Sequence, residues 1–289
     1  MKQLNLFVEL TRLKRPIGYM LLFWPCLWGL TIAYDFSMNL QIFIKYALLF
    51  LSGAILMRSA GCILNDIFDK DFDSKVERTK DRPIASGKVL VNQGLFYILI
   101  LCSLAFIVLI QFNLFTIILA LCSMPLAFTY PLMKRFTYWP QLFLGITFNY
   151  GLILGWTSIT GEISLVPLLF YLGAIFWTLG YDTIYGFQDI KDDEIIGVKS
   201  TSIKFKKNPK FFIILCYVIF TLDLTYLGFT MDFNKIYFGG LLIICMHLFF
   251  FQIKGLDIQS KKNCLKTFKS NNFLGLLIFL NIIIGKIIV

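Results

Sequence analysis

Charged side chains are scarce in this chain. Only 15% of the 289 residues are Asp, Glu, Lys or Arg, whereas 58% are hydrophobic. A soluble globular domain averages about 25% charged and about 45–50% apolar residues. Too little polar sequence is present to cover a buried soluble core, so the composition predicts a polytopic membrane protein.

Histidine and paired cysteine are also lacking. His247 is the only histidine, which argues against a histidine-based metal or haem site. The seven cysteines form no CxxC pair and most lie inside apolar runs, so they predict neither a disulfide framework nor a cysteine metal site. The N-terminal segment has no small-residue cleavage site after a short apolar core, and we expect it to be an uncleaved cytosolic segment.

Apolar runs of membrane-spanning length recur along the chain. A membrane helix needs about 17–25 mostly apolar residues. The nine candidates cover approximately residues 17–34, 43–67, 94–112, 114–130, 141–159, 165–187, 211–229, 236–251 and 273–288. We therefore expect an all-α bundle of about nine transmembrane helices, in a single domain over residues 1–289.

Basic residues concentrate in alternate loops. The N-terminal segment and the loops after the second, fourth, sixth and eighth helices hold 23 of the 27 Lys and Arg, whereas the opposite loops hold only Lys45 and Lys235. Because Lys and Arg are enriched in cytoplasmic loops, this pattern places the N-terminus in the cytoplasm and Val289 on the other side. The bias also explains the net charge of +10, so we expect no nucleic-acid partner.

Acidic residues gather in two patches on the cytoplasmic side, where the second and sixth helices end. The first patch reads N-D-I-F-D-K-D-F-D over residues 65–73. At about 100° per residue, Asp66, Asp69 and Asp73 lie at about 0°, 300° and 340° around a helix. Asn65 lies beside Asp69. Three carboxylates and an amide oxygen therefore share one face if the helix continues through Asp73.

The second patch follows from the sixth helix. Asp182, Asp189 and Asp193 lie at about 0°, 340° and 20° around a continuous helix, which predicts a narrow acidic stripe. Solvated loop charges are an adequate explanation for residues 191–194 alone. They do not explain Asp182, which lies inside a helix, because ionisable groups at membrane depth are costly and usually face a cavity. Arg58 is a similar case, on the Asn65 face about 10 Å deeper.

Clustered carboxylates repel one another unless a cation separates them. Mg²⁺ takes oxygen ligands and is typically held by one or two carboxylates together with substrate phosphates. Two facing clusters can hold two metal ions that clamp a diphosphate. Nearby basic residues can neutralise the remaining phosphate oxygens, and these are Lys75, Arg78, Arg82, Lys134, Arg135 and Lys199.

These motifs make the chain resemble the UbiA superfamily of membrane aromatic prenyltransferases. The family pattern N-D-x-x-D-x-x-x-D is met by Asn65, Asp66, Asp69 and Asp73, and the pattern D-x-x-x-D by Asp189 and Asp193. Segments 61–87 and 181–201, with the shorter 15–18 and 130–135, resemble the 4-hydroxybenzoate polyprenyltransferase branch. The resemblance covers roughly the first 205 residues; beyond them only hydrophobic helices are recognisable.

The resemblance implies a nine-helix bundle around a central cavity that opens to lipid. It implies a Mg²⁺-dependent reaction in which a polyprenyl diphosphate ionises to an allylic carbocation. The ring of 4-hydroxybenzoate then attacks at the carbon ortho to its hydroxyl, an early step of ubiquinone synthesis. We expect the inner membrane of a bacterium, with the active site on the cytoplasmic side and no obligate protein partner.

The resemblance also suggests roles for single residues. The two motifs would form the metal-diphosphate site, with Arg78, Lys134, Arg135 and Lys199 as phosphate contacts. Arg15 and Arg58 are candidates for the acceptor carboxylate, since a guanidinium suits bidentate binding. Asp182 would orient the acceptor or help remove its proton, and Tyr130 would approach the leaving oxygen or the cation. Two alternatives remain open: Arg58 could form a structural buried ion pair with Asp182, and Lys134 or Arg135 could be an ordinary cytoplasmic charge that follows the positive-inside bias.

Other functions compete with this interpretation. The same fold could use dihydroxynaphthoate, homogentisate, haem or a chlorin as acceptor. A transporter with an acidic gate would place its ions near the membrane midplane, whereas these acids lie at one membrane edge. A CDP-alcohol phosphotransferase would need a D-G-x-x-A-R pattern, which the chain lacks.

Overall fold

The computed structural model describes residues 2–75 and 79–287, and within these ranges the chain forms helices and no β-strand. The helices are α1 (Lys2–Leu10), α2 (Ile17–Ala33), α3 (Leu40–Phe68), α4 (Lys70–Asp73), α5 (Val91–Leu109), α6 (Leu114–Thr129), η1 (Tyr130–Leu132), α7 (Met133–Phe136), α8 (Pro140–Thr160), α9 (Leu165–Gly186), α10 (Ile190–Ile196), α11 (Thr201–Lys204), α12 (Pro209–Thr230), α13 (Lys235–Cys245), η2 (Met246–Lys254) and α14 (Lys261–Ile287).

The long helices confirm the predicted membrane bundle. In the part of the chain that the structure describes, eight helices are long and apolar enough to cross a membrane, counting the continuous stretches Leu114–Phe136 and Lys235–Lys254 as one each. The apolar helix α2 is slightly shorter, with 17 residues. The protein is therefore a multi-pass membrane protein with about nine spans.

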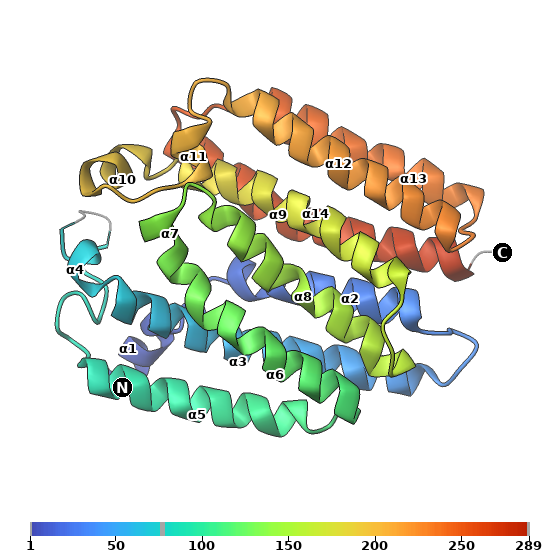
Figure 1. Ribbon diagram of the computed structural model, residues 1–289, viewed down its shortest axis with the longest axis horizontal. Helices are drawn as coiled ribbons and strands as arrows, with labels where there is room; N and C mark the ends of the chain where they lie inside the picture. The colour runs from blue at the N-terminus through green and yellow to red at the C-terminus, as the bar shows by residue number, and fades with distance from the viewer. Residues whose placement is uncertain (1, 76–78, 288–289) are drawn as a thin grey trace.

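The spans run side by side, and the short helices gather at one end of the bundle (Figure 1). Figure 1 shows α5 along one edge and α12 with α13 along the other, with α2, α8, α9 and α14 between them. α1, α4, α7, α10 and α11 all lie at the left end of this view. The loops after the second and sixth spans, which carry the acidic motifs, therefore meet at the same end, as the charge pattern predicts.

A polar side chain fixes the tight connection between α5 and α6. The Asn113 side chain accepts a hydrogen bond from Thr116 N at 2.9 Å and so caps α6. Its amide also donates to the carbonyl oxygens of Thr157 at 2.8 Å and Ser158 at 3.2 Å, near the end of α8. One residue thus ends the turn and ties it to the neighbouring span.

Close approach of α2 and α8 forms the centre of the bundle. A Cβ atom on Gly29 would lie 1.9 Å from the carbonyl oxygen of Leu152, and one on Gly155 would lie 2.2 Å from that of Cys26. Small residues let membrane helices pack backbone against backbone, where dispersion contacts replace the missing hydrophobic force. This contact sets the distance between α2 and α8, which flank the candidate active site.

Replacing Gly29 by alanine is expected to destabilise the protein by about 3 kcal/mol or more, because the added methyl meets backbone that has no rotamer to change. A thermal melt in detergent measures this effect. Gly53→Ala on α3 is the matched control, since nothing lies within 4 Å of its added Cβ. Equal melting temperatures for the two variants would contradict the assigned packing.

The last span begins earlier than the sequence predicts. α14 starts at Lys261 and not near residue 273. Its first turns alternate exposed lysines with the buried residues Cys264, Thr267 and Asn271, which repeat at helical spacing. The hydropathy of this amphipathic stretch is too low for the stretch to be recognised as part of a span, although its packed face continues the helix.

All seven cysteines are free.

Candidate active site

The first acidic motif lies where α3 ends. α3 ends at Phe68, but the backbone stays nearly helical, because Asp69 N bonds Asn65 O at 2.9 Å and Asp73 N bonds Asp69 O at 2.7 Å. Asp66, Asp69 and Asp73 are all buried, at 2%, 2% and 7% exposure. The three carboxylates therefore lie on one face, as predicted, although the regular helix ends at Phe68.

Basic side chains from three other segments meet this face. Arg12 donates to Asp66 Oδ1 at 2.6 Å. Arg82 bridges two motif residues, at 3.2 Å from Asp66 Oδ1 and 2.6 Å from Asp73 Oδ2. Lys134 donates to Asp69 Oδ2, which also accepts from the Asn65 amide at 2.9 Å. Every aspartate of the motif thus has a cationic neighbour.

Arg12 remains charged in this setting. Burial lowers the pKa of its guanidinium, while the neighbouring Cys62 and Asp66 raise it by more, so the net shift is upward. The guanidinium of Arg12 is therefore positively charged over the whole physiological pH range.

The second motif departs from the predicted stripe. α9 ends at Gly186, and the N–H groups of Gln188 and Asp189 bond carbonyls three residues back, both at 3.2 Å. α10 then begins at Ile190, so Asp182 does not lie on one continuous helix with Asp189 and Asp193, and the predicted stripe is wrong.

The turn after α9 has a packing cause. A Cβ atom on Gly186 would lie 2.3 Å from Ser202 Oγ, and that hydroxyl donates to Thr183 O at 2.8 Å. The segment after the motif therefore folds back onto the end of α9. Asp189 and Asp193 still lie one helical turn apart, since Asp193 N bonds Asp189 O at 2.9 Å, so their side chains are neighbours.

A second polar group lies deeper between the spans. Arg58 of α3 is half-buried and lies over the Phe148 ring at 5.4 Å. It interacts electrostatically with Tyr130 and Asp182. Arg58 and Asp182 both lie within the described residues and form no salt bridge with each other, so the buried ion pair considered from the sequence is not formed. A Cβ on Gly18 would lie 2.8 Å from Arg58 Nε, so the glycine of segment 15–18 leaves room for the guanidinium.

The oxygen-rich motif fits a hard divalent cation. Asp69 Oδ1 is buried and has no hydrogen-bond partner in the described part of the chain, although the other oxygen of the same carboxylate has two. A buried unsatisfied carboxylate oxygen is costly and is suited to a ligand. Within residues 2–75 and 79–287, no three His, Cys, Asp or Glu side chains form a ready-made metal cage. Mg²⁺ does not need one, because substrate phosphates complete its coordination.

A model of the UbiA prenyltransferase family matches residues 22–282 of the chain. The chain belongs to this family. UbiA membership was inferred above from the two acidic motifs, and the match extends it to the C-terminal spans, which carry no recognisable motif.

Relatives from animals and plants are similar over almost the whole chain. A mitochondrial 4-hydroxybenzoate polyprenyltransferase of Arabidopsis thaliana is 42% identical over 97% of this chain and 68% of its own length. The protein of the same name from Drosophila melanogaster is 41% identical over 98% of this chain and 71% of its own length. The human one is also 41% identical, over 99% of this chain and 76% of its own length.

Solved structures show the same fold at lower identity. The apo structure of a UbiA homologue from Aeropyrum pernix K1 has a TM-score of 0.76 and 21% identity, covering 92% of this chain and 97% of the other. A UbiA homologue from Archaeoglobus fulgidus bound to GPP and Mg²⁺ has a TM-score of 0.71 and 15% identity, covering 97% and 99%.

Two other basic residues predicted for the UbiA site, Arg135 and Lys199, donate to backbone carbonyls. Arg135 donates to Phe68 O at 2.6 Å and so satisfies a carbonyl at the end of α3. Lys199 donates to Phe136 O at 3.2 Å. Arg15 is exposed at the start of α2. Arg78 lies outside the described residues.

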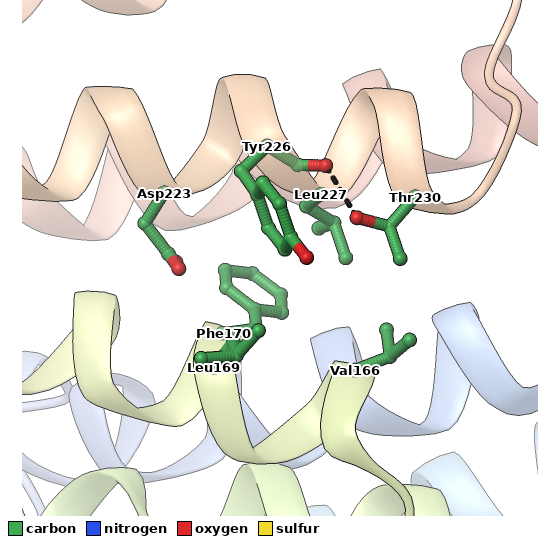
Figure 2. Close-up of a pocket in the computed structure, with 7 residues that line it drawn as sticks. All are labelled: Val166, Leu169, Phe170, Asp223, Tyr226, Leu227 and Thr230. Atoms are coloured by element: carbon green, nitrogen blue, oxygen red, sulfur yellow. Dashed lines mark hydrogen bonds between the residues drawn. The ribbon is translucent and has the colours of Figure 1, made fainter.

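Two cavities lie away from the UbiA motifs. One is a narrow gap between α9 and α12 with no room for a water molecule, and its lining includes Asp223 and Phe170 (Figure 2). The other is a groove of about 440 Å³ on α3, lined by residues that include Gln41 and Ser52. The predicted central cavity remains a prediction, supported by the partial exposure of Arg58 and Asp182 between the spans.

Proposed function

We propose that the chain transfers a polyprenyl group from polyprenyl diphosphate to the ring carbon ortho to the hydroxyl of 4-hydroxybenzoate, in ubiquinone biosynthesis. The observation that carries this proposal is the buried carboxylate face of the first motif, where one oxygen of Asp69 contacts Lys134 and the other has no hydrogen-bond partner among the described residues. The full-length similarity to enzymes named for this reaction supports it.

The donor diphosphate is proposed to bind at the two motifs. Asn65, Asp66, Asp69 and Asp73 would hold Mg²⁺ together with Asp193 of α10 and Asp189, which directly precedes α10. The metal held there would neutralise the negative charge that develops on the leaving diphosphate. Lys134 is the best-placed phosphate contact, because it already lies at Asp69. Arg78, Arg135 and Lys199 remain candidates that would have to turn toward the phosphates.

The acceptor is proposed to bind at the deeper polar group. Arg58 would bind the carboxylate of 4-hydroxybenzoate, since its guanidinium offers two parallel donors and forms no salt bridge with a carboxylate of the described residues. Arg15, exposed just before α2, is the second candidate. The acceptor ring would then lie between Arg58 and the donor, as ring attack requires.

Bond changes follow from this placement. The C1–O bond of the donor breaks and its electron pair leaves with the diphosphate. The ring carbon bonds to C1, and the ring proton is lost, with Asp182 proposed as the group that orients the acceptor or takes this proton. The rings of Tyr130 and Phe148 lie near Arg58 and can shield the allylic cation from water and stabilise it.

We propose that residues 1–289 act as one catalytic domain, with the N-terminus and the site on the cytoplasmic side. The positive-inside pattern and the gathering of short helices at one end support this orientation (Figure 1). A bacterial inner membrane is our proposal for location, while the relatives above are mitochondrial. The lipid bilayer is the expected environment, without an obligate protein partner.

The reaction is tested with purified protein in detergent. Radiolabelled 4-hydroxybenzoate, a polyprenyl diphosphate and Mg²⁺ should give a labelled product that extracts into organic solvent, and EDTA should abolish it. Dihydroxynaphthoate and homogentisate are tested in parallel. Product from either of these, with none from 4-hydroxybenzoate, would overturn the proposed acceptor while retaining prenyl transfer.

A further inference from the structure

The N-terminal helix α1 docks on the bundle beside the first motif. Leu10 is fully buried among Ala60 and Ile63 of α3 and their neighbours, and Phe7 meets the Tyr97 ring edge-on at 5.2 Å. The rest of α1 is largely exposed, and Leu4 is 66% accessible. α1 is therefore a surface helix attached to the spans through one apolar face.

The turn after α1 is strained at a single residue. Arg12 has φ of 56°, in the left-handed region that a non-glycine residue rarely adopts. The turn is closed by bonds from Arg12 N to Glu9 O at 3.2 Å and from Arg15 N to Arg12 O at 2.9 Å. Such a conformation persists only where other contacts hold it. The contact that fits this role is the 2.6 Å bond from the Arg12 guanidinium to Asp66.

Arg12 and a divalent cation would compete for the carboxylate of Asp66. Its Oδ1 atom accepts from both Arg12 and Arg82. Arg82 has a second carboxylate partner in Asp73, whereas among the described residues the Arg12 guanidinium has one other contact, with the Cys62 sulfur at 3.8 Å. A divalent cation on Asp66 would repel both arginines. Arg12 is the one that would be left without a carboxylate.

We propose that Arg12 is an exchangeable counter-ion, which occupies Asp66 in the free protein and transfers to diphosphate oxygens when the metal-diphosphate complex binds. The inference rests on the proposed function, because it assumes that Asp66 holds metal. Guanidinium binds phosphate oxygens in the same bidentate manner as it binds carboxylates, so the exchange replaces one charge-assisted contact by another. It also makes α1 responsive to occupancy of the site, since Arg12 lies two residues beyond Leu10.

Two binding measurements with opposite expected signs test this exchange. Isothermal titration calorimetry of the full-length protein in detergent measures the affinity for Mg²⁺ alone and for the complex of Mg²⁺ with inorganic pyrophosphate. Arg12→Gln is expected to bind Mg²⁺ alone about tenfold more tightly and the pyrophosphate complex about tenfold more weakly than the unmodified protein. Arg12→Lys keeps the charge and is expected to lie between the two.

Lys14→Gln is the matched control, because Lys14 carries the same charge on the same turn but is exposed and contacts none of the described residues of the motif. It should leave both affinities within about twofold, as expected for a screened surface charge. Weaker or unchanged Mg²⁺ binding in Arg12→Gln, or unchanged binding of the pyrophosphate complex, would overturn the exchange. Failure of the unmodified protein to bind the pyrophosphate complex would instead overturn the proposed metal-diphosphate site. Arg12→Lys keeps the test decisive if Arg12→Gln fails to fold.

Discussion

Replacing Asp69 by asparagine is expected to lower kcat/KM for prenyl transfer by about 10²–10³-fold, the usual effect of removing one group that stabilises a developing charge. Asp69 has a buried oxygen that no group of the described residues hydrogen-bonds, and its other oxygen contacts both Asn65 and Lys134. The amide has nearly the same shape but no charge, so the loss should appear in metal binding. Steady-state rates at increasing Mg²⁺ measure it, and the concentration of Mg²⁺ at half-maximal rate should rise.

Asp71→Asn provides the matched control for Asp69. Asp71 belongs to the same acidic segment but is exposed, on the side of the turn away from the buried carboxylates. It should retain activity within about twofold, because a solvated surface charge is largely screened. A loss in Asp71→Asn as large as in Asp69→Asn would show that the segment acts through its net charge and not through a particular ligand set.

Replacing Arg58 by methionine should raise the KM for 4-hydroxybenzoate about 30-fold or more, as expected when one partner of a buried charge pair is removed. Methionine keeps an unbranched apolar chain against Phe148, over which the guanidinium lies at 5.4 Å. The KM for the polyprenyl diphosphate should stay within about threefold, since the donor is proposed to bind at the acidic motifs. Initial rates with each substrate varied in turn separate the two effects.

Acceptor analogues sharpen the Arg58 prediction. The unmodified protein should discriminate strongly against an acceptor in which a hydroxymethyl group replaces the carboxylate, and Arg58→Met should lose most of this discrimination. Arg58→Lys, which keeps the charge but not the planar pair of donors, should fall between them. A donor KM that rises as much as the acceptor KM would instead place Arg58 in the diphosphate site.

The helices and the first motif could be predicted from the sequence because their signals are local. Each span is a long apolar run, and 100° per residue brings Asp66, Asp69 and Asp73 to one face. The same arithmetic was wrong for Asp182 and the second motif, because it assumed a helix through Gly186. The chain turns there to accommodate Ser202, which lies 16 residues later in the sequence and gives no local sign of its position.

The cations of the site were harder to predict because their partners are distant in sequence. Arg12 looked like an ordinary cytoplasmic charge, yet it meets Asp66 across 54 residues. Arg135 looked like a phosphate contact, yet it holds the carbonyl of Phe68. Both residues are basic, near the membrane and close to the motifs, so composition and spacing cannot separate them. Only the path of the backbone decides which side chain reaches a carboxylate.

The central claim is that both acidic motifs act on one metal-diphosphate centre. Pulsed EPR of Mn²⁺ with inorganic pyrophosphate, on the full-length protein in detergent, tests it most directly, because coupling to ³¹P reports a phosphate in the metal's first coordination sphere. We predict protein-bound Mn²⁺ with ³¹P coupling in the unmodified protein, and its loss in both Asp69→Asn and Asp189→Asn. An unchanged protein-bound signal in Asp189→Asn would contradict a shared centre.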